Sequence, residues 1–89
     1  MFIIEDEYHG EHQEGQYATF AEALAELRRR ATIPWDKPPN RAPCEGWRTC
    51  GRRYNIIEYD AARPQSNLPR IAVLEISATG VLWLNDFDA

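Results

Sequence analysis

Residues 19–31 read TFAEALAELRRRA, and they form the best-defined element that the sequence predicts. Thr19 followed three residues later by Glu22 is typical of a capping box, in which a hydroxyl and a carboxylate each satisfy a backbone N–H of the first helical turn. Apolar residues then recur at spacings of four, three and four. The pattern predicts a helix with one narrow apolar stripe, formed by Phe20, Leu24, Leu27 and Ala31 with Ala23 on its flank.

The end of this helix carries three consecutive arginines, Arg28–Arg30. Basic residues in a last turn and an acidic residue in the first turn both interact favourably with the helix dipole. The arginines therefore have a structural explanation before any ligand is considered. Pro34 disfavours the helical conformation at Ile33, so we expect the helix to end at this pair.

Short runs rich in β-branched and aromatic residues surround the helix and predict strands. Ala78-Thr79-Gly80 fits a three-residue hairpin connection between the last two runs, with glycine in the left-handed position. A short strand before the helix, within GQYATF (15–20), is predicted to pair back on the first run. The predicted runs are FIIEDEY (2–8), RYNIIEYD (53–60), RIAVLEIS (70–77) and VLWL (81–84).

This order predicts a small α+β fold: a mainly antiparallel sheet of three to five strands, with one amphipathic helix packed on one face. The length of 89 residues predicts a single domain over residues 1–89. Four prolines and two glycines occur between Pro34 and Gly51, which excludes a helix or a central strand there. Because tryptophans and cysteines in this stretch prefer burial, we expect an ordered loop over residues 34–52 between helix and sheet.

Alternation assigns apolar side chains to both faces of the predicted sheet. Ile71, Val73 and Glu75 would share one face, and Ala72, Leu74 and Ile76 the other. A single helix covers one face, so the other needs a different cover. The alternatives are the 34–52 loop, with Trp35 and Trp47 as its apolar side chains, or a second protein chain.

The net charge of −4 conceals a segregation along the chain. Residues 1–26 carry seven acidic residues and no lysine or arginine, whereas residues 27–53 carry eight basic and two acidic residues, a net +6. Such asymmetry is typical of a protein with an anionic partner. It is also what a fold produces in which acidic and basic segments face each other.

The basic loop, residues 34–53, contains the sequence RAPCEGWRTCGRR at positions 41–53. Tryptophan and arginine dominate binding hot spots, and prolines reduce the entropy that a loop loses on binding. We therefore expect a non-enzymatic interaction or regulatory module that binds another protein, or a second copy as a homodimer. The predicted partner-binding residues are Trp47, Arg41, Arg48, Arg52, Arg53 and Trp35.

The two cysteines, Cys44 and Cys50, support an alternative as a redox-sensing or metal-stabilised domain. Arginines beside Cys50 would stabilise a thiolate. The five residues between the cysteines do not fit the usual spacing of zinc or Cys-x-x-Cys redox motifs. His9 and His12 are further possible zinc ligands, but nothing in the sequence brings them to the loop, so we expect no metal site and no cofactor.

Nucleic-acid binding through the same loop is a further alternative, because aromatic and basic residues alternate along it. A pI of about 5.1 opposes it. No nucleophile-elbow, phosphate-loop or metalloprotease motif occurs, so we expect no enzymatic activity. The acidic start and the short apolar runs predict a cytoplasmic protein that does not bind membranes.

Overall fold

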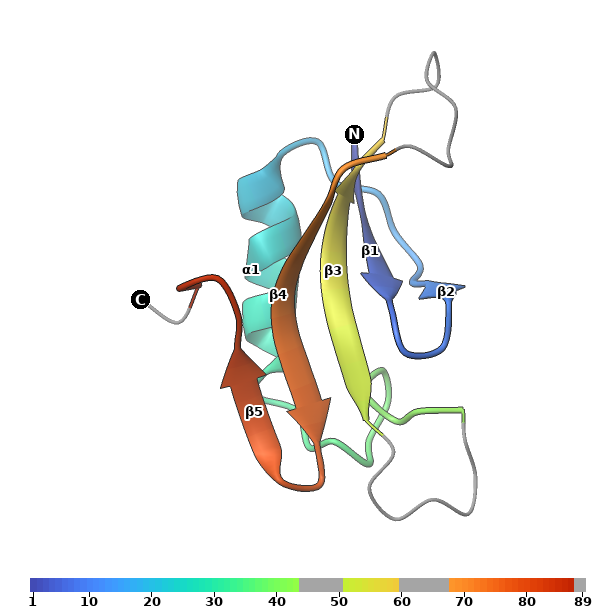
Figure 1. Cartoon of the computed structure of the whole chain (residues 1–89), viewed down its shortest axis with the longest axis vertical. Helices are drawn as coiled ribbons and strands as arrows, with labels where there is room; N and C mark the ends of the chain where they lie inside the picture. Colours follow the sequence, from blue (N-terminus) through green and yellow to red (C-terminus); the bar gives the residue numbers. More distant parts are fainter. Residues whose placement is uncertain (44–50, 60–67, 88–89) are drawn as a thin grey trace.

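A computed structural model of the chain describes residues 1–43, 51–59 and 68–87. Within these ranges it contains a five-stranded antiparallel sheet and one helix, which confirms the predicted α+β fold (Figure 1). The order along the chain also agrees with the prediction. The elements are β1 (Phe2–Asp6), β2 (Glu11–His12), α1 (Phe20–Arg30), β3 (Arg52–Glu58), β4 (Arg70–Ser77) and β5 (Gly80–Trp83).

The strands lie side by side in the order β2-β1-β3-β4-β5, so that β3 occupies the centre. β1 pairs with β3 from Phe2 opposite Glu58 to Asp6 opposite Tyr54. The second strand differs from its predicted position, because β2 lies at Glu11–His12. The predicted 15–20 segment makes only an isolated bridge between Tyr17 and Phe2, since the chain must reach the helix cap two residues later.

Helix α1 begins as predicted. The Thr19 hydroxyl accepts a hydrogen bond from the Glu22 backbone N–H at 3.1 Å. The Glu22 carboxylate accepts from the backbone N–H of Ala18, one residue before the cap, at 3.0 Å. The helix ends at Arg30 with Ala31 as its C-cap, earlier than the predicted Ile33-Pro34 boundary.

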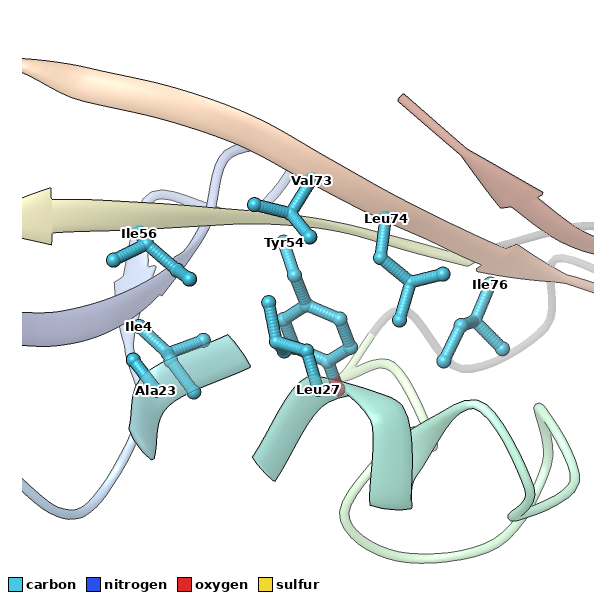
Figure 2. Packing of buried hydrophobic residues seen from close by; sticks show 8 residues of the cluster. All are labelled: Ile4, Ala23, Leu27, Tyr54, Ile56, Val73, Leu74 and Ile76. Atoms are coloured by element: carbon cyan, nitrogen blue, oxygen red, sulfur yellow. The ribbon is translucent and has the colours of Figure 1, made fainter. Parts of the chain in front are cut away.

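The core lies between α1 and the sheet. Ala23 and Leu27 are fully buried there, and the ring of Tyr54 reaches from β3 toward the helix (Figure 2). Phe20 packs edge-on against Phe2, with 6.1 Å between the ring centroids. The buried cluster consists of Ile4, Ala23, Leu27, Tyr54, Ile56, Val73, Leu74 and Ile76.

The alternation predicted for β4 is wrong at Val73 and Leu74, because both are fully buried in the same core cluster. Tyr54 lies opposite Leu74, whereas the next residue, Asn55, lies opposite Ala72, which leaves Val73 as an extra residue on β4. Such a bulge resets which side chains face the core. Figure 2 shows both side chains extending from β4 to the helix side.

Candidate functional site

The predicted site residues fall into two groups. Trp47, Arg48, Cys44 and Cys50 lie outside the described residues, so their roles stay predictions from the sequence. Among the others, Trp35 is partly buried against the core cluster, on the helix side of the sheet. Arg41 is exposed, Arg53 has a side chain that is 32% exposed, and Arg52 is buried.

Arg52 connects β3 to β1 inside the molecule. Its Nη1 donates to Asp6 Oδ2 at 2.9 Å and to Glu11 Oε1 at 3.1 Å. Asp6 is fully buried at the end of β1, and its other oxygen accepts from the backbone N–H groups of Tyr8 and Arg53. A buried charge needs such partners, so the geometry gives Arg52 a structural role.

The basic loop is attached to this ion pair through its backbone. Arg52 donates from Nε to the Asn40 carbonyl at 3.2 Å and from Nη2 to the Arg41 carbonyl at 2.8 Å. The Asn40 side chain is also buried, and its Nδ2 donates to the carbonyls of Arg30 and Ile33. The Asn40 Oδ1 accepts from the hydroxyl of Tyr54 at 3.0 Å. The described part of the loop before β3, residues 34–43, is therefore attached both to the end of α1 and to β3.

Asp6 and Asn40 are not among the site residues predicted from the sequence. Asn40 follows two prolines, and asparagine often bonds to nearby backbone, which is a weak signal for the contacts to Arg30 and Ile33. No pattern in the sequence pairs Asp6 with Arg52, because the two residues are 46 positions apart.

The sheet face opposite α1 is covered by charged side chains. Arg53 lies between two carboxylates, 2.8 Å from Glu7 and 3.1 Å from Glu75. Glu75 also accepts a 2.5 Å hydrogen bond from the Tyr8 hydroxyl, which raises the pKa of Tyr8. Arg70 pairs with Glu5 at 3.0 Å. This face therefore carries cations whose charge is already neutralised.

Two of the three helix arginines, Arg29 and Arg30, are paired as well. Arg29 makes two hydrogen bonds to Glu26, and Arg30 makes a third from Nε at 2.7 Å. The Arg29 hydrogen bonds, together with those of Arg30, hold the pKa of Glu26 below its usual value of about 4.5. The long-range pairs of Arg52 with Asp6 and of Arg53 with Glu7 support the alternative that acidic and basic segments face each other in the fold.

Arg28, Lys37 and Arg41 form no ion pair with any other described residue, and all three are exposed. Lys37 and Arg41 belong to the basic loop. The backbone N–H of Arg41 donates to the Lys37 carbonyl at 3.0 Å, which closes a single turn between them. Among the described residues of the loop, the exposed cations without an ion pair are therefore held at one turn.

A cleft of about 600 Å³ lies on the helix-free face, at the side of the sheet where β1 and β3 meet the 12–16 segment. Apolar side chains, Ile3, Ile57 and Leu68, meet polar ones there, among them His12 and Arg70. His12 Nε2 lies 3.8 Å from the same Glu5 carboxylate that pairs with Arg70. Folding brings these distant segments together, so the sequence alone did not predict the cleft.

The two histidines do not form a joint site. His9 Nδ1 lies 2.5 Å from Asp6, whereas His12 faces Glu5, the neighbouring residue whose side chain points to the other side of β1. Within the described ranges, no group of three His, Cys, Asp or Glu side chains could hold a metal ion.

Across the same ranges, no helix has the length and apolar character needed to span a bilayer. Comparisons with protein-family models, with curated proteins and with solved structures each found no match.

Proposed function

We propose that the protein is a non-enzymatic interaction module that binds a carboxylate-rich surface of another protein through the basic loop. The observation that carries this proposal is the turn that presents Lys37 and Arg41, which are exposed and have no ion-pair partner among the described residues. Trp47 and Arg48 belong to the same loop and remain predicted contacts. Arg52 acts as the internal anchor of the loop in this proposal.

The attachment of the loop supports its use as a binding surface. Buried Asn40 ties the loop to the end of α1, and buried Arg52 ties it to β1 and β3. Residues that are already held in place, as Asn40 and Arg41 are by these hydrogen bonds, lose less conformational entropy when a partner binds. Arginine and lysine on such a loop are suited to charge-assisted hydrogen bonds with carboxylates.

The distribution of charge favours a protein partner over nucleic acid. A nucleic-acid backbone presents a regular array of phosphates and is held by several unpaired cations. On the sheet face, Arg53 and Arg70 are already neutralised by carboxylates, and the chain as a whole carries −4. A small acidic patch on a protein needs only the few cations that the loop presents.

The test uses two arginines that are both exposed and both without an ion pair in the described part of the chain. Partners are captured with wild-type bait in the presence of nuclease and identified, and the purified partner is then titrated calorimetrically. We expect Arg41→Glu to raise the dissociation constant about tenfold or more, and the matched Arg28→Glu variant to change it by less than about twofold.

Three outcomes would contradict the proposal. Equal weakening by both variants would indicate a non-specific charge effect. Unchanged binding by Arg41→Glu would place the interface elsewhere, and loss of all partners after nuclease treatment would favour the nucleic-acid alternative.

A further inference from the structure

The two edges of the sheet differ in how they are protected. At one edge, β2 consists of two residues, Glu11 and His12, and short charged edge strands do not pair readily with other chains. At the other edge, β5 consists of four residues, and no charged side chain occurs between Ser77 and Asn85. Figure 1 shows β5 as the outermost strand on its side. The β5 edge therefore lacks the charged side chains that often prevent strand addition.

The hydrogen-bond pattern identifies which backbone groups of β5 are available. The backbone N–H of Leu84 donates to the Val73 carbonyl at 2.8 Å. Because backbone groups alternate in direction along a strand, those of Leu82 point toward β4 like those of Leu84. The N–H and C=O groups of Val81 and Trp83 then point away from β4. Within the described residues, β5 pairs with no other strand on that side.

The side chains along this edge are apolar and accessible. Val81 lies opposite Ile76 on the helix side of the sheet and is 43% exposed. Leu82 lies opposite Glu75 on the other face and is 55% exposed. An added strand would cover both side chains and satisfy the outward backbone groups.

We propose that a second copy of this chain pairs with β5 in antiparallel fashion, with Leu82 opposite Leu82 of the second copy on a two-fold axis. In this register Val81 lies opposite Trp83 of the second copy, and both side chains are on the helix side. Val81 and Trp83, whose backbone groups point away from β4, therefore face each other across the interface. Each of the two symmetry-related pairs forms two backbone N–H···O=C hydrogen bonds. Leu82 and its copy form the central pair, with no hydrogen bond between them.

The occupant is a second copy because the edge is complementary to itself. The outward-facing residues flank Leu82 symmetrically, so an identical strand presents its hydrogen-bonding groups at matching positions. Charge also favours contact at this edge. Two chains that each carry a net charge of −4 repel each other, and this repulsion is weakest where the contacting surface is uncharged. Glu75, beside Leu82, is neutralised by Arg53 at 3.1 Å.

Four residues form a small contact, well under the roughly 1,200 Å² typical of stable interfaces, so we expect a weak dimer that depends on concentration. Sedimentation velocity of the full chain from about 10 µM to about 1 mM should show an increasing dimer fraction. The proposal concerns residues outside the basic loop, so either proposal can fail while the other stands.

The decisive variants place charges on the axis. Leu82→Lys and Leu82→Glu each oppose like charges across the two-fold axis, and each should weaken dimerisation about tenfold or more. An equimolar mixture of the two variants should restore association, because Lys then opposes Glu. The matched control is Ile71→Lys, an apolar residue of β4 that is 41% exposed and does not lie on β5, and it should dimerise like wild type.

Circular dichroism and thermal melting confirm that each variant is folded before sedimentation. A wild-type chain that stays monomeric at about 1 mM overturns the proposal. Equal loss of dimer in Ile71→Lys and Leu82→Lys also overturns it, since the contact would not be specific to β5. Failure of the Lys and Glu variants to associate with each other overturns the register and the two-fold arrangement.

Discussion

Arg52 and Asp6 form a buried ion pair that joins the start of β3 to the end of β1, with 2.9 Å between Nη1 and Oδ2. Their side chains are 7% and 0% exposed. Asp6 also accepts from two backbone N–H groups, and Arg52 also donates to two carbonyls of the basic loop. The pair therefore holds three separate segments of the chain together.

We expect Asp6→Ala and Arg52→Ala each to lower the free energy of unfolding by about 3–5 kcal/mol, because each removes the buried ionic partner of the other residue. The double variant should lose less than the sum of the two single losses, since neither member of the pair then remains buried without the other. Urea denaturation of the three variants measures this. Strictly additive losses would show that the two groups do not interact. Exposed Arg28→Ala is the control and should change stability by less than about 0.5 kcal/mol.

The contacts of Asn40 predict a ranking of two further variants. Asn40→Ala leaves the buried carbonyl of Arg30 and the partly buried carbonyl of Ile33 without that donor and should cost about 2–3 kcal/mol. Tyr54→Phe removes one hydroxyl and should cost about 1 kcal/mol. Hydrogen exchange at the Arg41 amide, which donates within the loop, should accelerate in Asn40→Ala and stay near the wild-type rate in Tyr54→Phe. The opposite ranking would mean that Asn40 does not order the loop.

Gly51 is predicted to tolerate no side chain. A Cβ atom at this position would lie 2.3 Å from the Ile76 carbonyl oxygen and 2.8 Å from the Ser77 Cβ. Gly51→Ala should therefore lower the melting temperature, with a cost of about 1–3 kcal/mol as for other overpacked sites. The comparison is Gly10→Ala, where φ is +59° and nothing lies within 4 Å, so only backbone strain of about 1 kcal/mol is expected. A larger loss for Gly10→Ala would contradict the close approach at Gly51.

Stability at alkaline pH should depend on Tyr54. Burial raises the pKa of Tyr54 above its usual value of 10.0, and the Arg30 guanidinium, 5.1 Å from the ring centroid, offsets part of this shift. A raised pKa in the folded state means that the unfolded chain loses this proton first as pH rises. The stabilising contribution is therefore complete below pH 10 and is lost as pH rises above it. Thermal melting from neutral to strongly alkaline pH should show a smaller alkaline loss in Tyr54→Phe than in wild type, and identical slopes would contradict the assignment.

The local elements of the fold could be predicted because their signals lie within a few residues of one another. The Thr19 cap, the spacing of Leu24 and Leu27, and the β-branched runs at 53–60 and 70–77 each report the conformation of their own segment. The same reasoning failed where pairing with a strand far away in the sequence determines the conformation. β2 lies at Glu11–His12 because it pairs with the end of β1, and the bulge at Val73 arises from the pairing of β4 with β3.

For the candidate site, the sequence located the basic loop but could not distinguish its accessible cations from its buried ones. Arg41 and Arg52 are the same residue type in the segment predicted as the basic loop, yet Arg41 is exposed, whereas Arg52 begins β3 and lies against Asp6. The difference comes from the side of β3 on which Arg52 points and from the acidic residue that β1 brings there. Neither is a property of the loop sequence.

The α+β class, the place of the helix and the concentration of positive charge in residues 27–53 follow from the sequence alone, because each depends on residue types and short spacings. The tertiary structure is needed to show which charges remain available, why Gly51 must lack a side chain and which edge of the sheet carries no charge. These features depend on strand register, and register sets contacts between residues that are far apart in the chain.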